Sequence, residues 1–225
     1  MMQMIFWAAP LLVFVVALAL EIGLGLPLTA DELAPVEMFQ AVLLGLGVIA
    51  AIRAYRWSRA EHSPLALWFV LAIAGCTYVL LEEVSYGQHL FGWATPEGWN
   101  ALNDQGETNL HNTSAWFDQK PRILLEVGVL TATLAATFCA FRSRPLLPRL
   151  GSVMPGSAVI APGWIAVAAF ILDEVLLNTL GLDFGIARPS ELEELYLYWT
   201  VLAYLAERYP QARHLPAARG QAGLR

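Results

Sequence analysis

The chain has 225 residues, of which 57% are hydrophobic and only 14% are charged, with eight tryptophans and a net charge of −6. A soluble domain carries about 25% charged residues, so this composition excludes an ordinary soluble protein and indicates an integral membrane protein. The two cysteines, Cys76 and Cys139, lie inside apolar runs and argue against a disulfide framework.

A membrane span needs about 20 mostly apolar residues. The sequence therefore predicts an all-α integral membrane bundle with spans at about 5–28, 34–53, 64–84, 122–141, 157–180 and 190–208. The first segment is interpreted as a retained span, with a cleaved signal peptide as the alternative. The sixth is the weakest and has a helix lying in the membrane interface as its alternative. A single domain, 1–210, is expected, followed by a disordered cytoplasmic tail, 211–225.

Basic residues predict the orientation of these spans. With six spans, every arginine falls on one side except Arg122 and Arg188, which lie on the other side together with Lys120. Because the arginine-rich side is the cytoplasmic one, both termini are predicted to be cytoplasmic. The acidic residues show the opposite distribution, since only Glu61 and Glu207 fall on the cytoplasmic side.

Acidic residues also gather at a similar depth near the outer ends of five spans. They are Glu21, Glu82, Glu83, Glu126, Asp173, Glu174, Glu191 and Glu194. Charges inside a membrane are costly and face the bundle interior, so these side chains are expected to form one polar layer. For Glu191, Glu193 and Glu194 a plain helix-start role explains the charge equally well, because the helix dipole favours acids there.

The longest connection is the outer loop between the third and fourth spans, at about 85–121, and loops of that length are often functional. Thr95 and Pro96 predict a short helix at 96–103 that begins with Thr95 as its cap. If the chain is helical again further on, Glu107 and His111 share one face. A carboxylate and an imidazole on one face can supply metal ligands or an acid–base pair.

The stretch "EEVSYGQHLFGWATPEGWNALNDQGETNLHN" resembles a block of an uncharacterised family of bacterial multi-pass membrane proteins. The matching residues are Glu82, Glu83, Ser85, Gly87, Gln88, Thr95, Pro96, Glu97, Gln105, Gly106, Glu107, Asn109, Leu110, His111 and Asn112. The family more often has Arg at the position of His89, which weakens His89 as a ligand. The resemblance implies a bacterial inner membrane and marks the block as the site, but it names no reaction.

Three functions are compatible with this pattern. The first is a metal-dependent membrane enzyme at the periplasmic face, using Mn, Fe or Zn because the ligands are oxygens and one imidazole. Its expected catalytic residues are Glu83, Glu107 and His111. Its expected metal ligands are Glu82, Glu83, Glu107, His111 and Glu174, supported by Gln88, Gln105, Asn109, Asn112 and Asp173.

The second is a non-catalytic subunit of a larger membrane complex, in which the block is a hydrogen-bonded plug. The third, a proton or cation transporter, ranks last because no carboxylate lies clearly near the middle of the membrane. The expected partners are the lipid bilayer and other membrane subunits. A nucleic-acid partner is not expected, because the outer side has no basic patch.

Overall fold

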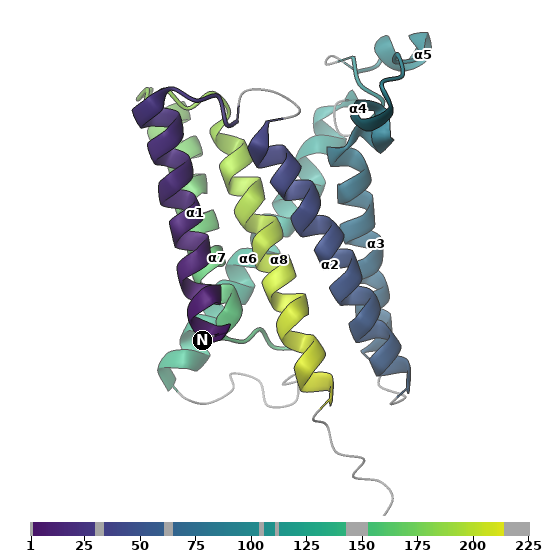
Figure 1. The fold of residues 1–225 in the computed structure, drawn as a ribbon, viewed down its shortest axis with the longest axis vertical. Helices are drawn as coiled ribbons and strands as arrows, with labels where there is room; N and C mark the ends of the chain where they lie inside the picture. Colours follow the sequence, from purple (N-terminus) through teal and green to yellow (C-terminus); the bar gives the residue numbers. More distant parts are fainter. Residues whose placement is uncertain are drawn as a thin grey trace, which may run out of the picture.

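The computed structural model describes residues 2–29, 34–60, 65–103, 106–110, 113–142 and 153–213, and this part of the chain is helical, with no strand. The elements are α1 (Met2–Leu24), α2 (Pro35–Ala60), α3 (Ala66–Glu83), η1 (Ser85–Gly87), α4 (Gln88–Phe91), α5 (Glu97–Asn100), α6 (Ala115–Arg142), η4 (Ser157–Val159), α7 (Ile160–Phe170), η5 (Ile171–Thr179) and α8 (Pro189–Arg213). The long helices run alternately up and down in one bundle (Figure 1). The predicted all-α class is thus confirmed for the described residues.

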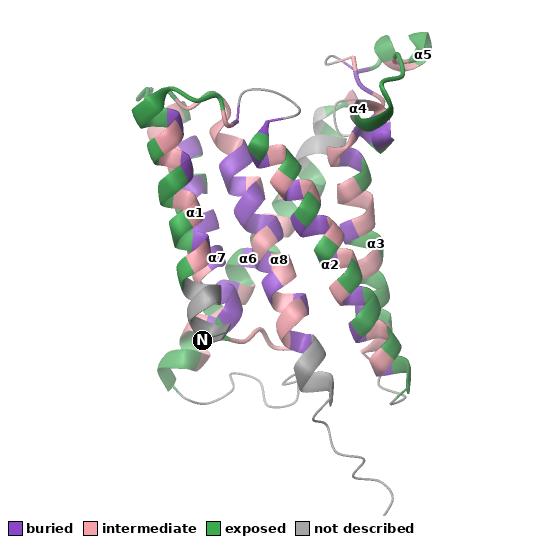
Figure 2. Cartoon of the chain, viewed as in Figure 1, coloured by how far each residue is buried: buried purple, intermediate pink, exposed green. Residues whose placement is uncertain are grey.

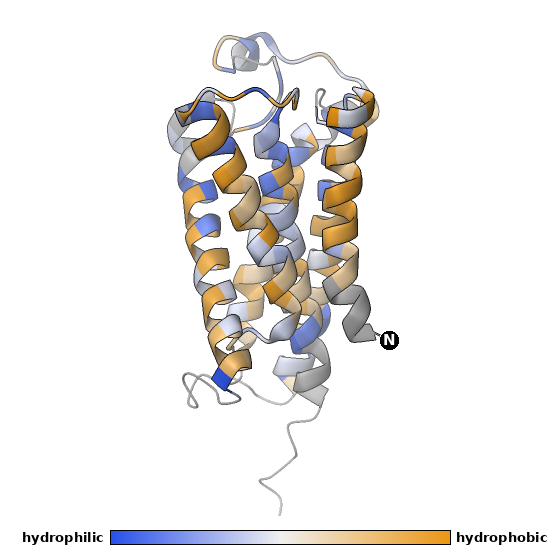
Figure 3. Cartoon of the chain, turned by 90° about the vertical axis from the view of Figure 1, so that its left-hand side faces the viewer, coloured by the Kyte–Doolittle hydropathy of each residue, from blue (hydrophilic) through white to orange (hydrophobic). Residues whose placement is uncertain are grey.

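Four helical stretches are long and apolar enough to cross a membrane: Pro35–Ala60, Ala66–Glu83, Lys120–Arg142 and Ser157–Thr179. A shorter apolar stretch, Ala8–Leu24, lies in α1. Hydrophobic residues dominate the middle of the bundle, and hydrophilic ones are more frequent towards its two ends (Figure 3). This distribution is typical of helices that cross a lipid bilayer.

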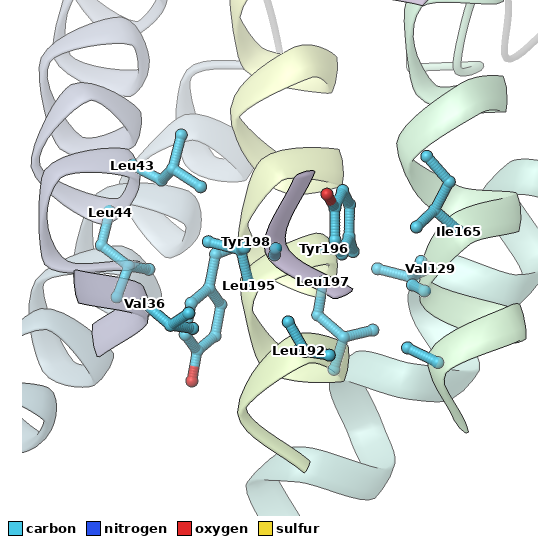
Figure 4. Packing of buried hydrophobic residues seen from close by; sticks show 13 residues of the cluster. Val36, Leu43, Leu44, Val129, Ile165, Leu192, Leu195, Tyr196, Leu197 and Tyr198 are labelled. Carbon is cyan, nitrogen blue, oxygen red and sulfur yellow. The ribbon is translucent and has the colours of Figure 1, made fainter. Parts of the chain in front are cut away.

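Helix α8 forms the centre of the bundle and packs mainly against α2 and α7. Its Leu192, Leu195 and Tyr196 are buried in the main hydrophobic cluster, and buried residues are concentrated along it (Figure 2). In the close view, α8 lies between Leu43 of α2 and Ile165 of α7 (Figure 4). Contacts with α1, α2, α6 and α7 bury several polar side chains of α8, among them Glu191, Glu193 and Thr200.

Candidate functional site

The chain makes a strained turn directly after α3 ends at Glu83. Ser85 and Tyr86 have φ angles of 45° and 53°, and Gly87 follows with a φ of 98°. The left-handed region costs a residue with a side chain roughly 1–2 kcal/mol. Other contacts must therefore hold the turn in place.

Glu82 makes the first of these contacts. Its Oε1 accepts a hydrogen bond from the Tyr86 hydroxyl at 2.7 Å, and its Oε2 accepts one from the backbone N–H of Leu110 at 2.7 Å. The Glu82 side chain is buried at the end of α3. Partial burial, together with the hydrogen bond to Glu82 and the charge of Glu82, raises the pKa of Tyr86 to about 12. The phenol therefore keeps the proton that it donates.

Ser85 is held from the other side by Glu107 and two asparagines. Its Oγ donates to Glu107 Oε2 at 2.8 Å, and Asn109 Nδ2 donates to both Ser85 Oγ (3.1 Å) and Glu107 Oε2. Asn103 orients this pair, because its Nδ2 donates to Asn109 Oδ1 at 2.8 Å and its Oδ1 accepts the Glu107 N–H at 3.2 Å. Ser85 is 1% exposed and Glu107 is 6% exposed, so the hydroxyl and the carboxylate meet away from solvent.

Gln88 joins the turn to the following loop. Its Oε1 accepts the backbone N–H of Thr108 at 2.7 Å, and its Nε2 donates to the Thr95 hydroxyl at 2.7 Å. The Thr95 hydroxyl donates in turn to the carbonyl oxygen of Gly106. We call the assembly of residues 82–103 and 106–110 the polar cap, because side chains satisfy much of its irregular backbone.

One expectation for this loop was wrong, and the condition attached to a second is not met within the described residues. The helix predicted at 96–103 is only the single turn α5, and Thr95 does not cap it, because Pro96 occupies the cap position and the Thr95 hydroxyl bonds elsewhere. Residues 106–110 are irregular, so Glu107 does not lie on a helix from which His111 would share its face. Hydrogen bonds between distant parts of the loop, such as that from Thr95 to Gly106, determine its conformation here instead of the local capping signal.

Glu83, at the start of the polar cap, binds α8. Its Oε1 accepts a hydrogen bond from the Tyr198 hydroxyl at 2.7 Å, and the same hydroxyl lies 3.4 Å from Glu194 Oε2. The two neighbouring carboxylates of the Glu82–Glu83 pair therefore serve different partners. One holds the cap, and the other connects α3 to α8.

Arg122 of α6 binds the first turns of α8. Its guanidinium lies 2.5 Å from Glu193, 3.2 Å from Glu194 and 3.0 Å from Glu126. Glu193 is almost fully buried, with 1% of its side chain exposed, so it depends on this cation. Three carboxylates share one arginine, which explains how α6 and α8 bring several acids to one level.

A second arginine cluster lies between α2 and α8. Arg188 contacts Glu37 at 2.9 Å and Glu191 at 2.7 Å. Gln40 Nε2 also donates to the Glu191 side chain at 3.1 Å and to its backbone oxygen at 2.9 Å. Arg122 and Arg188 thus neutralise part of the acidic layer that the sequence predicts.

The predicted site residues do not form one group in the structure. The polar cap brings together Glu82, Gln88, Glu107 and Asn109, whereas Glu83 joins α8. Asp173 is buried on η5 and accepts a hydrogen bond from Asn178 at 3.3 Å, while Glu174 is exposed on the same element. The predicted residues Gln105, His111 and Asn112 lie outside the described residues. Within the described ranges, no three His, Cys, Asp or Glu side chains converge as metal ligands, so these residues do not by themselves fit a metal centre.

Contributors that the sequence prediction missed include Ser85, Asn103, Tyr198 and Arg122. Ser85 belongs to the recognised block, so its place in the pattern was an available signal. For Tyr198 and Arg122 the sequence offers only their neighbours four residues away, Glu194 and Glu126. Their partners Glu83 and Glu193 lie 115 and 71 residues away along the chain, so pattern reasoning does not find them. No protein-family model, curated protein or solved structure matches this chain.

Proposed function

We propose that the chain is a bacterial inner-membrane protein with six spans and both termini in the cytoplasm. In this arrangement, α1 and α8 are the two spans in addition to the four long apolar helices. A low hydropathy is expected for α8, because a helix surrounded by other helices need not be apolar on every face. Arg59 and Arg142 lie in the last turns of α2 and α6, at the end of the bundle opposite the polar cap, which supports a cytoplasmic assignment for that end.

We propose further that the polar cap holds the acid–base site of a membrane enzyme. The observation that carries this proposal is the direct contact between the Ser85 hydroxyl and Glu107, with Asn109 bonded to both. A nucleophile within hydrogen-bond reach of a base, which a third group orients, is the arrangement used in covalent catalysis. The left-handed backbone at Ser85 and Tyr86 adds support, since such strain gathers at functional sites.

The reaction that suits this pair is acyl transfer from an ester. Ser85 Oγ bonds to the ester carbonyl carbon while its proton passes to Glu107, and the bond from that carbon to the leaving oxygen then breaks. The departing alcohol takes the proton from Glu107. A water molecule then attacks the acyl carbon while Glu107 accepts a proton from it, the bond to Ser85 Oγ breaks, and Glu107 passes that proton to Ser85 Oγ.

A fluorophosphonate probe tests this proposal without knowledge of the substrate, because it labels activated serines. We expect wild-type protein in detergent to be labelled at Ser85, identified by mass spectrometry, and Ser85→Ala and Glu107→Gln to lose the label. Labelling is expected to be slow, because Ser85 is buried. Ser157→Ala, at an exposed serine, is the matched control and is expected to retain wild-type labelling.

Equal labelling of wild type and Ser85→Ala would refute the nucleophile assignment. An unlabelled wild type would favour the second candidate function, a non-catalytic subunit in which the cap is only a plug. The burial of Ser85, Asn103, Glu107 and Asn109 favours that candidate, since a membrane protein must satisfy irregular backbone near the lipid. A metal role requires ligands outside the described residues, such as the predicted His111, because the described residues do not supply three.

A further inference from the structure

An apolar surface lies on the outside of the polar cap. Phe91 is 78% exposed, Leu90 is 62% exposed and Trp93 is 41% exposed. The rings of Phe91 and Trp93 are stacked, with their centroids 5.8 Å apart and their planes 8° from parallel. We call these three residues the aromatic hook. Large apolar side chains exposed together in this way mark a surface that meets another apolar phase or a partner.

The hook is held in one orientation by the cap. Its helical turn, α4, lies between Gly87 and Gly92, which have φ angles of 98° and 69° and therefore favour glycine. A Cβ on Gly87 would lie 3.2 Å from the Phe91 ring, so the ring packs directly over the glycine. Gln88 begins the same turn and is bonded on the cap side to Thr95 and Thr108. The turn thus presents a polar side to the cap and an apolar side outwards.

The position of the hook indicates what covers it. It follows the end of α3, a helix of membrane-span length, after only one short turn, and it lies at the α3 end of the bundle (Figure 1). The outward surface of α3 is apolar as well, including the exposed Leu71 and Leu81. No Asp, Glu, Lys or Arg occurs between Val84 and Pro96, so this stretch has no permanently charged side chain. Aromatic side chains concentrate where the hydrocarbon meets the headgroups.

We propose that the aromatic hook inserts into the boundary between headgroups and acyl chains of the leaflet on the cap side, beside α3. The lipid-facing surface of α3 then continues onto the cap. The hook fixes the depth of the cap relative to the membrane. This inference does not depend on whether Ser85 is a nucleophile, because it concerns the opposite side of the same turn.

Spin-label accessibility tests the inference in the full chain, with Cys76 and Cys139 replaced by alanine and the protein reconstituted singly into phosphatidylcholine nanodiscs. A nitroxide is attached to Leu90→Cys and, as a matched control, to Gly98→Cys on α5, where an added side chain meets no neighbour within 4 Å. Leu124→Cys, on the exposed surface of α6, is the lipid reference. We expect the label at 90 to collide more with oxygen than with a water-soluble nickel chelate, as at 124, and the label at 98 to show the reverse.

Equal access of the chelate to positions 90 and 98 would overturn the proposal, because the hook would then be in water. A second result would also overturn it. If position 90 is protected from both reagents in densely packed liposomes but is reached by the chelate in single-copy nanodiscs, the surface binds a second copy of the chain. Phe91→Ser in the Leu90→Cys background provides a second measurement. It is expected to raise the chelate collision rate at 90 several-fold while leaving position 124 unchanged.

Discussion

Single residues decide how closely the helices approach one another. Gly163 of α7 lies against Thr133 of α6 so tightly that an added Cβ would overlap the threonine hydroxyl. Thr133 cannot easily move away, because it is fully buried and its hydroxyl donates to the carbonyl of Val129 at 2.7 Å. Small residues at such crossings are a general means of packing helices in membranes.

Gly163→Ala is therefore expected to destabilise the protein by about 1–3 kcal/mol, the usual cost of overpacking. The measurement is the thermal unfolding midpoint in detergent. Gly45→Ala on α2 is the control, since no atom lies within 4 Å of its added methyl group, and removal of a helical glycine is expected to be neutral or stabilising by up to about 1 kcal/mol. Equal midpoints for the two variants would show that α6 and α7 are not packed as described.

The sequence predicts the long helices well, because each helix depends on the residues of its own segment. The long apolar runs reappear as α1, α2, α3, α6, α7 with η5, and α8, because hydropathy and length act within each segment. The polar cap could not be predicted in the same way. Its central bond, from Ser85 to Glu107, joins residues 22 positions apart, and contacts of that kind override the local capping signal at Thr95.

Arg122 connects two elements, because it belongs to α6 and pairs with Glu193 and Glu194 of α8. Arg122→Met is expected to destabilise the fold by about 3–5 kcal/mol, because it leaves the buried Glu193 charge without its partner. Arg53→Met, at an exposed position of α2, is the control and is expected to change stability by less than about 0.5 kcal/mol. Both are measured by thermal unfolding.

A partial recovery in the double variant Arg122→Met with Glu193→Gln would identify the buried charge as the cause, since both members of the pair are then neutral. A double variant that is as unstable as the sum of the two single changes would instead assign the loss to packing. The helical content of each variant, followed by circular dichroism, distinguishes either result from failure to fold.

At the scale of the whole molecule, the long helices alternate in direction, so α1 begins and α8 ends at the same end of the bundle (Figure 1). The proposed topology makes this the cytoplasmic side. In a bacterial host, we expect a C-terminal green fluorescent protein fusion to be fluorescent and a C-terminal alkaline phosphatase fusion to be inactive. A cysteine at position 98, in the cap, is expected to react with an impermeant maleimide added to spheroplasts. The opposite pattern of results would show that the protein has the inverted orientation in the membrane.

The central position of α8 has a consequence for biosynthesis. In the chain, α8 comes after every helix against which it packs. While the earlier helices are being synthesised and inserted, Gln40 and Arg122 therefore lack the α8 partners that they have in the finished protein, Glu191 and Glu193. Glu37 likewise lacks Arg188, which directly precedes α8. Until α8 is inserted, these polar groups need other partners, either water at the membrane surface or the insertion machinery. Docking of α8 is then the step that converts a set of inserted helices into one folded protein.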